Sequence, residues 1–208
     1  MNKLKAALAS ALVAVCVAPL SAQAAFVLDT GVPSGSGLAA NLDSSDYYAA
    51  EFTLGASQTI TSIESYVTAG ADSPGDTFTL ALYSAADFGQ RTSTPVFAGQ
   101  ATYEADGWTG LTGLGLSGLA AGNYWAAVEV GSADSAFALG LPTPAAGGAA
   151  PALAYAFNSG PGYTTAGAPA IGMEVQVAPV PLPGALLLLG SGLLGLGGAA
   201  RRRVARVD

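Results

Sequence analysis

The side chains that could do chemistry in this 208-residue chain are carboxylates, hydroxyls and aromatic rings, because histidine is absent and cysteine occurs once. Without histidine the commonest general base and metal ligand is missing, which excludes His-dependent triads and most zinc sites. Two carboxylates at a suitable separation would suffice for a glycosidase, and Glu104 with Glu129 or Asp106 is the pair to consider. Carboxylates on turns and strand faces are ordinary, so the sequence favours a non-catalytic protein, with a secreted carboxylate-dependent hydrolase as an alternative.

Asp72 and Asp76 enclose a short Ser-Pro-Gly turn and offer oxygen atoms, the ligands that Ca²⁺ prefers. Their spacing is not that of an EF-hand loop. The sequence therefore predicts a simple turn and no cofactor. Ca²⁺ bound by Asp72 and Asp76 is the alternative.

Three aromatic residues, Trp108, Tyr124 and Trp125, are candidates for stacking on sugars, because each ring combines an apolar face with a polar edge. Side chains alternate along a strand, so Trp125 should lie opposite Tyr124. At most one of these two can then share a face with Trp108. Core packing of the inward residue is the simpler expectation, and a carbohydrate-binding face is the alternative.

The seven basic residues are concentrated at the two ends of the chain. Lys3 and Lys5 lie at the start, four arginines lie within residues 201–206, and only Arg91 lies between them. Residues 29–174 contain thirteen acidic residues against this one arginine, a formal charge of −12. Phosphate contacts would be repulsive there, which excludes a nucleic-acid partner. Positive charge resists translocation, so basic ends around an acidic middle indicate that the middle is exported.

Residues 1–24 have the three parts of a secretory signal peptide. A short basic start is followed by an apolar run at 6–17 and by an Ala-Gln-Ala cleavage site that ends at Ala24. Cleavage by signal peptidase would make Ala25 the first mature residue. It would also remove Cys16, so that neither disulfides nor thiol chemistry would be available to the exported chain.

Residues 184–200 form an uncharged run of leucine, glycine, alanine and one serine. As a helix this run would span about 26 Å at roughly 1.5 Å per residue, close to the ~30 Å hydrocarbon core of a bilayer. The arginines Arg201, Arg202 and Arg203 follow directly and would stop transfer. The sequence thus predicts a transmembrane helix at 184–200 and a cytoplasmic basic tail at 201–208, which hold the precursor in the inner membrane.

The segment before this helix carries a sorting motif. Val180, Pro181, Leu182 and Pro183, followed by the apolar run and the arginines, resemble the PEP-CTERM sorting signal of Gram-negative bacteria. That signal combines a Pro-x-Pro motif, an apolar span and a basic end, and is processed by exosortase, a membrane cysteine protease. The usual Val-Pro-Glu-Pro motif is replaced here by a Val-Pro-Leu-Pro variant. The resemblance covers residues 180–208.

The resemblance implies an exported surface or extracellular-matrix protein of the biofilm type, with exosortase and the export machinery as partners. Extracellular polysaccharide is a further implied partner. The segments Gly107-Trp108 and Gly122-Asn123-Tyr124-Trp125 and their order along the chain also resemble the single β-sandwich domains of many PEP-CTERM proteins. Those domains have no defined activity.

Residues 25–178 are predicted to form the exported domain, an antiparallel β-sandwich of jelly-roll type, between the signal peptide and the sorting signal at 179–208. Apolar and polar residues alternate with a period of two in many segments. The clearest runs are Phe78, Leu80 and Leu82; Tyr124, Ala126 and Val128; and Ile171, Met173, Val175 and Val177. Further strands are expected at 48–54, 59–68, 96–103, 135–141 and 153–157, and loops at the Gly- and Pro-containing segments 32–37 and 142–151.

Overall fold

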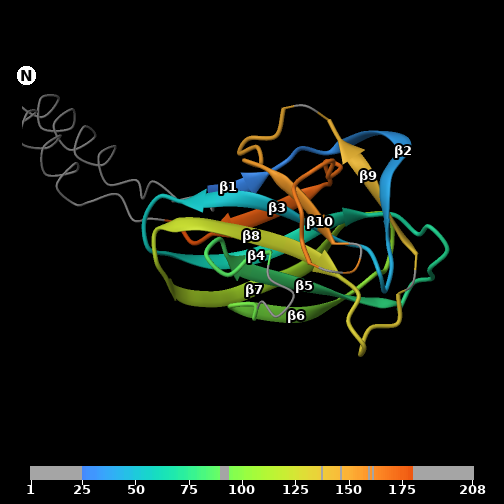
Figure 1. Ribbon diagram of the computed structural model, residues 1–208, viewed down its shortest axis with the longest axis horizontal. Helices are drawn as coiled ribbons and strands as arrows, with labels where there is room; N and C mark the ends of the chain where they lie inside the picture. The colour runs from blue at the N-terminus through green and yellow to red at the C-terminus, as the bar shows by residue number, and fades with distance from the viewer. Residues whose placement is uncertain are drawn as a thin grey trace, which may run out of the picture. The chain divides into compact units, whose positions relative to one another are not determined.

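Antiparallel strands account for all the regular structure that the computed structural model describes (Figure 1). The described residues are 25–179, apart from 90–93, 137, 146, 159 and 161, and the side chains of 34–37 are also left undescribed. The predicted signal peptide, sorting motif, transmembrane helix and basic tail lie outside these residues. The all-β class predicted from the alternating runs is confirmed for the described part.

Eleven strands follow one another along the described chain. They are β1 (Ala25–Asp29), β2 (Pro33–Leu42), β3 (Tyr47–Leu54), β4 (Gln58–Val67), β5 (Thr77–Ser84), β6 (Phe97–Thr102), β7 (Gly107–Leu119), β8 (Gly122–Glu129), β9 (Leu139–Pro144), β10 (Tyr155–Asn158) and β11 (Met173–Val177).

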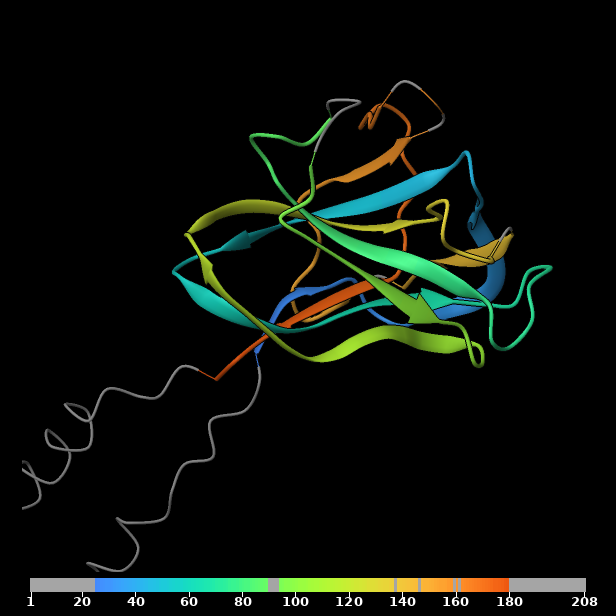
Figure 2. The same cartoon turned by 90° about the horizontal axis from the view of Figure 1, so that it is seen from below.

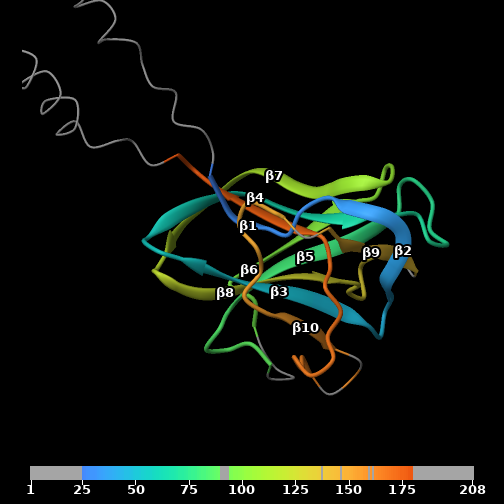
Figure 3. The same cartoon turned by 90° about the horizontal axis from the view of Figure 1, so that it is seen from above.

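The strands form two large sheets and one two-stranded ribbon. The four-stranded sheet has the order β1-β11-β4-β7, the five-stranded sheet has the order β10-β3-β8-β5-β6, and β2 pairs with β9. Two views at right angles to Figure 1 show the two large sheets as separate layers (Figures 2 and 3). The arrangement is that of a β-sandwich, in which most neighbouring strands are distant in sequence.

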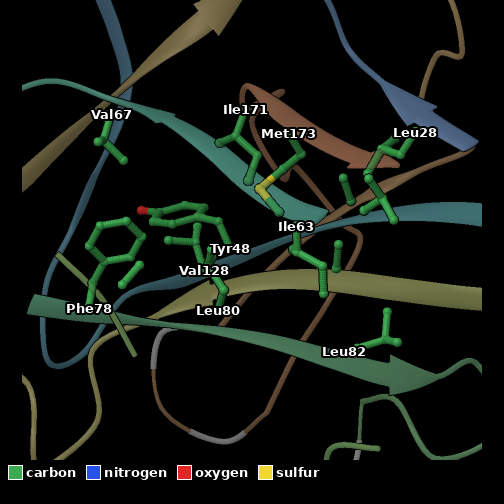
Figure 4. Close-up of a cluster of buried hydrophobic side chains, with 14 of the residues drawn as sticks. Leu28, Tyr48, Ile63, Val67, Phe78, Leu80, Leu82, Val128, Ile171 and Met173 are labelled. Carbon is green, nitrogen blue, oxygen red and sulfur yellow. The ribbon is translucent and has the colours of Figure 1, made fainter. Parts of the chain in front are cut away.

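The core fills the space between the two large sheets. Leu28, Ile63 and Met173 from the four-stranded sheet point toward Phe78 and Leu80 from the five-stranded sheet, and all five are inaccessible to solvent (Figure 4). The three alternating runs singled out in the sequence all place their apolar side chains here. Those predictions of inward faces are confirmed, because the period-two pattern records which face of each strand is buried.

The first and last strands of the domain lie side by side. Ala25 pairs with Val177, and the pairing continues to the other end of β1. Just beyond β1, the Thr30 hydroxyl accepts a hydrogen bond from the Met173 N–H at 2.8 Å, and the Thr30 N–H donates to the Met173 carbonyl at 3.1 Å. The described chain therefore enters and leaves the sandwich at neighbouring positions.

Two predicted loops are strands in part. Segment 32–37 lies largely within β2, and the start of 142–151 belongs to β9, with Pro33 opposite Pro144. Proline is compatible with this ribbon because each of its two strands needs to donate hydrogen bonds on one side only. Irregular register between β2 and β9 accommodates the intervening glycines.

Strand β7 was not predicted, because glycine is depleted in strands. It runs for thirteen residues, Gly107–Leu119, with glycines in its interior. Gly110 is required there, since a Cβ at this position would lie 2.3 Å from the Ile63 carbonyl oxygen of β4. The strand expected at 153–157 begins two residues later in the structure, since β10 starts at Tyr155 and Leu153 is 59% exposed before it.

Truncation of the core provides a test of this packing. We expect Phe52→Ala, which removes a ring that is 1% exposed and packs beside Tyr124, to lower the free energy of unfolding by about 3–5 kcal/mol. The same truncation at Phe26, which is 39% exposed, should cost less than about 1 kcal/mol. Urea unfolding monitored by circular dichroism measures both, and equal losses would contradict the core described here.

Candidate functional site

Each large sheet turns one face to the core and the other outward, because successive side chains point to opposite sides of a strand. The outer face of the four-stranded sheet carries Asp29 on β1, Glu174 on β11, Glu64 and Tyr66 on β4, and Trp108 on β7. The buried residues that alternate with them fix this outward orientation. We call this surface the Glu174 face.

A row of three carboxylates crosses the Glu174 face. Asp29 lies directly opposite Glu174, and Glu174 lies directly opposite Glu64 on the next strand. Asp29 also holds the adjacent loop, since its two carboxylate oxygens accept hydrogen bonds from the Gly31 N–H at 2.9 Å and the Ala149 N–H at 2.8 Å. Like charges directly opposite each other on neighbouring strands are destabilising. The residues that the structure describes include no lysine, arginine or histidine to offset this repulsion.

The environment of this row disfavours its charged state. Partial burial, followed by the negative charges of Asp29 and Glu64, raises the pKa of Glu174 to about 7. Partial burial also raises the pKa of Glu64. Near neutral pH, Glu174 therefore exchanges between a carboxylic acid that can donate a hydrogen bond and a carboxylate that can pair with a cation.

An aromatic pair borders the carboxylates. Tyr66 and Trp108 lie opposite each other in the β4–β7 register, with ring centroids 5.4 Å apart and planes at 83°. Both side chains are half-buried. Glu64 is two residues from Tyr66 on the same face, and its Cγ lies 2.9 Å from the position that a Cβ at Gly110 would occupy. The bare backbone at Gly110 thus makes room for the Glu64 side chain beside Trp108.

Ser62 completes the face with an unpartnered hydroxyl. It precedes Glu64 by two residues on β4, so it points to the same side, between Gln176 on β11 and Thr112 on β7. The residue is only 4% exposed, and its Oγ has no hydrogen-bond partner in the described part of the chain. An unsatisfied buried hydroxyl costs about 1–3 kcal/mol, so Ser62 gives this face hydrogen-bonding capacity that no described residue uses.

The outer face of the five-stranded sheet has a different character. Four alanines lie in one row across four neighbouring strands, and all are at most 1% exposed: Ala156, Ala49, Ala127 and Ala81. Large rings cover them: Tyr83 and Trp125 from the sheet, and Phe88 and Tyr163 from two loops. Phe88 stacks on Trp125 with centroids 4.2 Å apart and planes at 8°. We call these four rings and their alanine floor the Trp125 cluster.

Glu129 lies at the edge of the Trp125 cluster. One of its oxygens, Oε1, accepts hydrogen bonds from the Tyr83 hydroxyl at 2.9 Å and from the Tyr163 hydroxyl at 2.5 Å. Burial raises the pKa of Glu129 although both hydrogen bonds act in the opposite direction, and the charge of Asp134 adds to the increase. Burial and the nearby Glu129 in turn raise the pKa of Tyr163 well above its ordinary value. These contacts tie the loop that carries Tyr163 to β5 and β8 of the sheet.

The structure separates the three aromatic residues that the sequence grouped as a glycan platform. Trp108 lies on the Glu174 face, Trp125 lies on the outer face of the other sheet, and Tyr124 points into the core beside Phe52. The expected opposition of Tyr124 and Trp125 is therefore observed, but the three rings share no surface. Trp108 has Tyr66 as its partner instead, a residue that the sequence reasoning did not single out.

The two aspartates considered for Ca²⁺ both accept hydrogen bonds from protein groups. Asp72 is buried and accepts from the Ala138 N–H at 2.8 Å. Asp76 accepts from the Ser73 N–H at 2.8 Å and from the Ser135 hydroxyl at 3.0 Å. These bonds fix the turn and join it to the segment before β9. Among the described residues, no group of three or more carboxylates is arranged to hold a metal ion.

The acidic residues considered for hydrolysis take different structural roles. Glu104 is exposed in the turn between β6 and β7. Asp106, in the same turn, accepts hydrogen bonds from the Tyr103 hydroxyl at 2.7 Å and from the Ala69 N–H at 2.9 Å. Glu129 belongs to the Trp125 cluster. Asp106 and Glu129 are thus both engaged in hydrogen bonds that hold loops to the sheets.

The fold and the two outer faces define an all-β, sandwich-type domain whose outer sheet faces carry acidic and aromatic side chains. A comparison with protein-family models, with characterised proteins and with solved structures finds no match to this chain.

No helix within the described residues is long and apolar enough to cross a membrane.

The carboxylate row was not predicted from the sequence, although the outward orientation of Glu174 could have been. Alternation with Met173 and Val175 already pointed Glu174 away from the core. Its opposition to Glu64 and Asp29 depends on which strands flank β11 and in what register, and no local pattern specifies either.

Truncation of the two tryptophans separates their roles. Trp125 is 6% exposed and stacks on Phe88, so Trp125→Ala should lower the free energy of unfolding by about 3–5 kcal/mol. Trp108→Ala should cost less than about 2 kcal/mol, because that ring is half-buried on an open face. Chemical unfolding of the two variants checks this order, and a larger loss for Trp108 would overturn the assignment of faces.

The carboxylate row predicts a loss of stability as pH rises. The folded chain holds the Glu174 proton up to a pKa of about 7, whereas the unfolded chain releases it near the ordinary value of 4.5. Stability should therefore decrease between these two pH values and stay reduced above them. Glu174→Gln should remove part of this decrease and be more stable than the parent by about 1 kcal/mol at pH 8, a value discounted for solvent screening.

Urea unfolding at a series of pH values measures the effect of Glu174→Gln. Glu104→Gln is the matched control, because it removes an exposed carboxylate and should leave the pH profile unchanged. An equally steep decrease in the Glu174 variant would show that this residue ionises normally in the folded protein.

Proposed function

We propose that this protein is an exported bacterial surface or extracellular-matrix protein that exosortase sorts through the signal at 180–208. The observation that carries the proposal is the distribution of charge. An acidic segment of −12 lies between a basic signal-peptide start and a C-terminal series of Pro-x-Pro motif, apolar run and arginines. These are the parts, in order, of a chain that is translocated and then stopped in a membrane.

The C-terminal limit of the folded domain supports this division. Strand β11 ends at Val177, and Ala178 and Pro179 follow it outside any strand, shortly before Val180. Every described strand pairs with another described strand. Removal of the signal peptide by signal peptidase and of the sorting signal by exosortase would therefore leave these strand pairs intact.

We further propose that the domain is a jelly roll. Jelly rolls contain eight strands in two sheets, arranged as two Greek keys. The order β1-β11-β4-β7 in one sheet and β3-β8-β5-β6 in the other supports this topology, with the first and last strands adjacent. In this jelly-roll arrangement, β2, β9 and β10 are additions to the eight-stranded framework.

The proposed sorting mechanism has three physical parts. Pro181 and Pro183 keep the motif extended, because proline lacks the N–H that a helix needs and restricts the residue before it. The run at 184–200 places this motif at the outer face of the inner membrane as the precursor waits for exosortase. The arginines Arg201, Arg202 and Arg203 keep the tail in the cytoplasm and so fix the orientation.

We propose a non-catalytic, structural or interaction role for the mature domain at the cell surface or in the extracellular matrix. A carbohydrate-binding role is the second candidate, and the Glu174 face favours it. There, the half-buried Tyr66 and Trp108 lie beside Glu64 and Glu174 on one open sheet face. Aromatic rings that stack on sugar rings, flanked by groups that bind hydroxyls, are what such a site requires.

Substitution of the motif tests the sorting proposal. Pro181→Ala combined with Pro183→Ala should leave unprocessed precursor in the membrane fraction, because the segment could then continue as a helix and no longer be presented to the protease. Immunoblotting of membrane and released fractions from the native host measures the two forms.

Pro179→Ala provides the matched control, since this proline lies just outside the motif. It should be processed like the parent. Normal maturation of the double variant, or an equal defect in the Pro179 variant, would refute recognition of the Pro-x-Pro motif.

A further inference from the structure

Among the described residues, the Glu174 face has no partner of opposite charge. Its carboxylates Asp29, Glu174 and Glu64 lie opposite one another on three neighbouring strands, and the described residues contain no basic side chain. Each neighbouring pair of like charges lowers stability. A ligand that brings positive charge to this row would relieve the repulsion, whereas an anionic ligand would increase it.

The three carboxylates do not converge on one point. No group of three or more such residues in the described ranges is close enough to hold a metal ion. The strands are about 4.8 Å apart, so the row extends over roughly 10 Å from β1 to β4. A row of this kind fits an extended ligand with several separate cationic groups.

Two further features of the face point to a ligand with rings and hydroxyls. Tyr66 and Trp108 form the aromatic pair at its β7 side, and aromatic rings bind both the apolar faces of sugars and cations. Ser62, whose buried hydroxyl has no partner among the described residues, lies between Gln176 and Thr112. The aromatic pair favours a ligand that combines ring surfaces with positive charge over one that carries positive charge alone.

We propose that the Glu174 face binds an amine-bearing polysaccharide, a polymer of hexosamine units whose amino groups are free and protonated. Its ammonium groups would pair with the row of Asp29, Glu174 and Glu64 in charge-assisted hydrogen bonds. Its sugar rings would stack against Trp108 and Tyr66. The inference rests on the proposed function in that such a polymer lies outside the cell, and it names the ligand class for the interaction role.

Calorimetric titration of the full chain in non-ionic detergent tests the proposal near pH 6.5. The probes are a β-linked glucosamine hexamer, the N-acetylglucosamine hexamer of equal length, and hexalysine. The glucosamine hexamer should bind at least about tenfold more tightly than the acetylated one, because acetylation removes the charge. It should also bind more tightly than hexalysine, which has no ring to stack on Trp108.

Variants locate the site. Glu174→Gln and Glu64→Gln keep the shape of the side chain and remove its charge, so each should weaken binding of the glucosamine hexamer about tenfold. Glu174→Gln should do so while raising stability, a combination that a merely structural residue would not give. Trp108→Ala should weaken binding of the glucosamine hexamer more than binding of hexalysine, because a lysine side chain can make a cation–π contact with this ring but has no sugar ring to stack on it. Glu104→Gln, the exposed control, should change neither.

A proton count gives a second measurement. An ammonium beside Glu174 would lower its raised pKa, with Asp29 and Glu64 as the other ionisable carboxylates facing it. Binding should then release a fraction of a proton, which appears as a difference in measured heat between buffers of different ionisation enthalpy. In the Glu174→Gln variant the measured heat should no longer differ between the buffers, which would assign the released proton to Glu174.

Several outcomes would overturn the proposal: no binding of the glucosamine hexamer, equal binding of its acetylated form, or no effect of either Glu→Gln change. If hexalysine binds as tightly as the glucosamine hexamer, the face binds cations without selectivity for sugars. That result would also overturn the proposal. The sorting proposal stands apart from these results, because it depends on processing of the Pro181 and Pro183 variant. Failure of the polysaccharide-binding proposal can therefore be distinguished from failure of the sorting proposal.

Discussion

The pairing of β1 with β11 is the interaction on which the rest of the structure depends. These strands are the first and last of the domain, and their hydrogen bonds join residues about 150 positions apart in the sequence. The pairing completes the four-stranded sheet, brings Leu28 and Val175 to the core, and sets Asp29 against Glu174. It also places Ala25, the first described residue, opposite Val177, the last residue of β11.

The two sheets use their outer faces differently, although both obey the same alternation. On the five-stranded sheet, small alanines leave a shallow floor that loop aromatics fill, and the Glu129 carboxylate fastens two tyrosines there. On the four-stranded sheet, Glu64 and Glu174 are half-buried and unpaired with any described cation. One outer face is thus covered by aromatic side chains of the domain itself, and the other is the face that we propose binds a ligand.

Much of the core could be predicted from sequence, whereas the strand β2, the second half of β9 and the strand β7 could not. Phe78, Leu80 and Leu82 alternate cleanly because one side of β5 meets apolar groups and the other does not. Gly110 in β7 and Pro33 in β2 oppose strand formation locally. Long-range packing overrides that preference, since Gly110 lets β7 approach β4 closely and Pro33 lies at a strand end.

The sequence by itself determined the all-β class, the inward side of the regular strands and the concentration of acidic residues between two basic ends. These properties are local or compositional, so they need no knowledge of strand neighbours. Only the tertiary structure decided that Trp108 lies beside Tyr66 rather than Trp125, and that Glu174 faces Glu64 and Asp29. The physical reason is that a strand's period of two fixes its faces, but its partners and register arise from hydrogen bonds between distant segments.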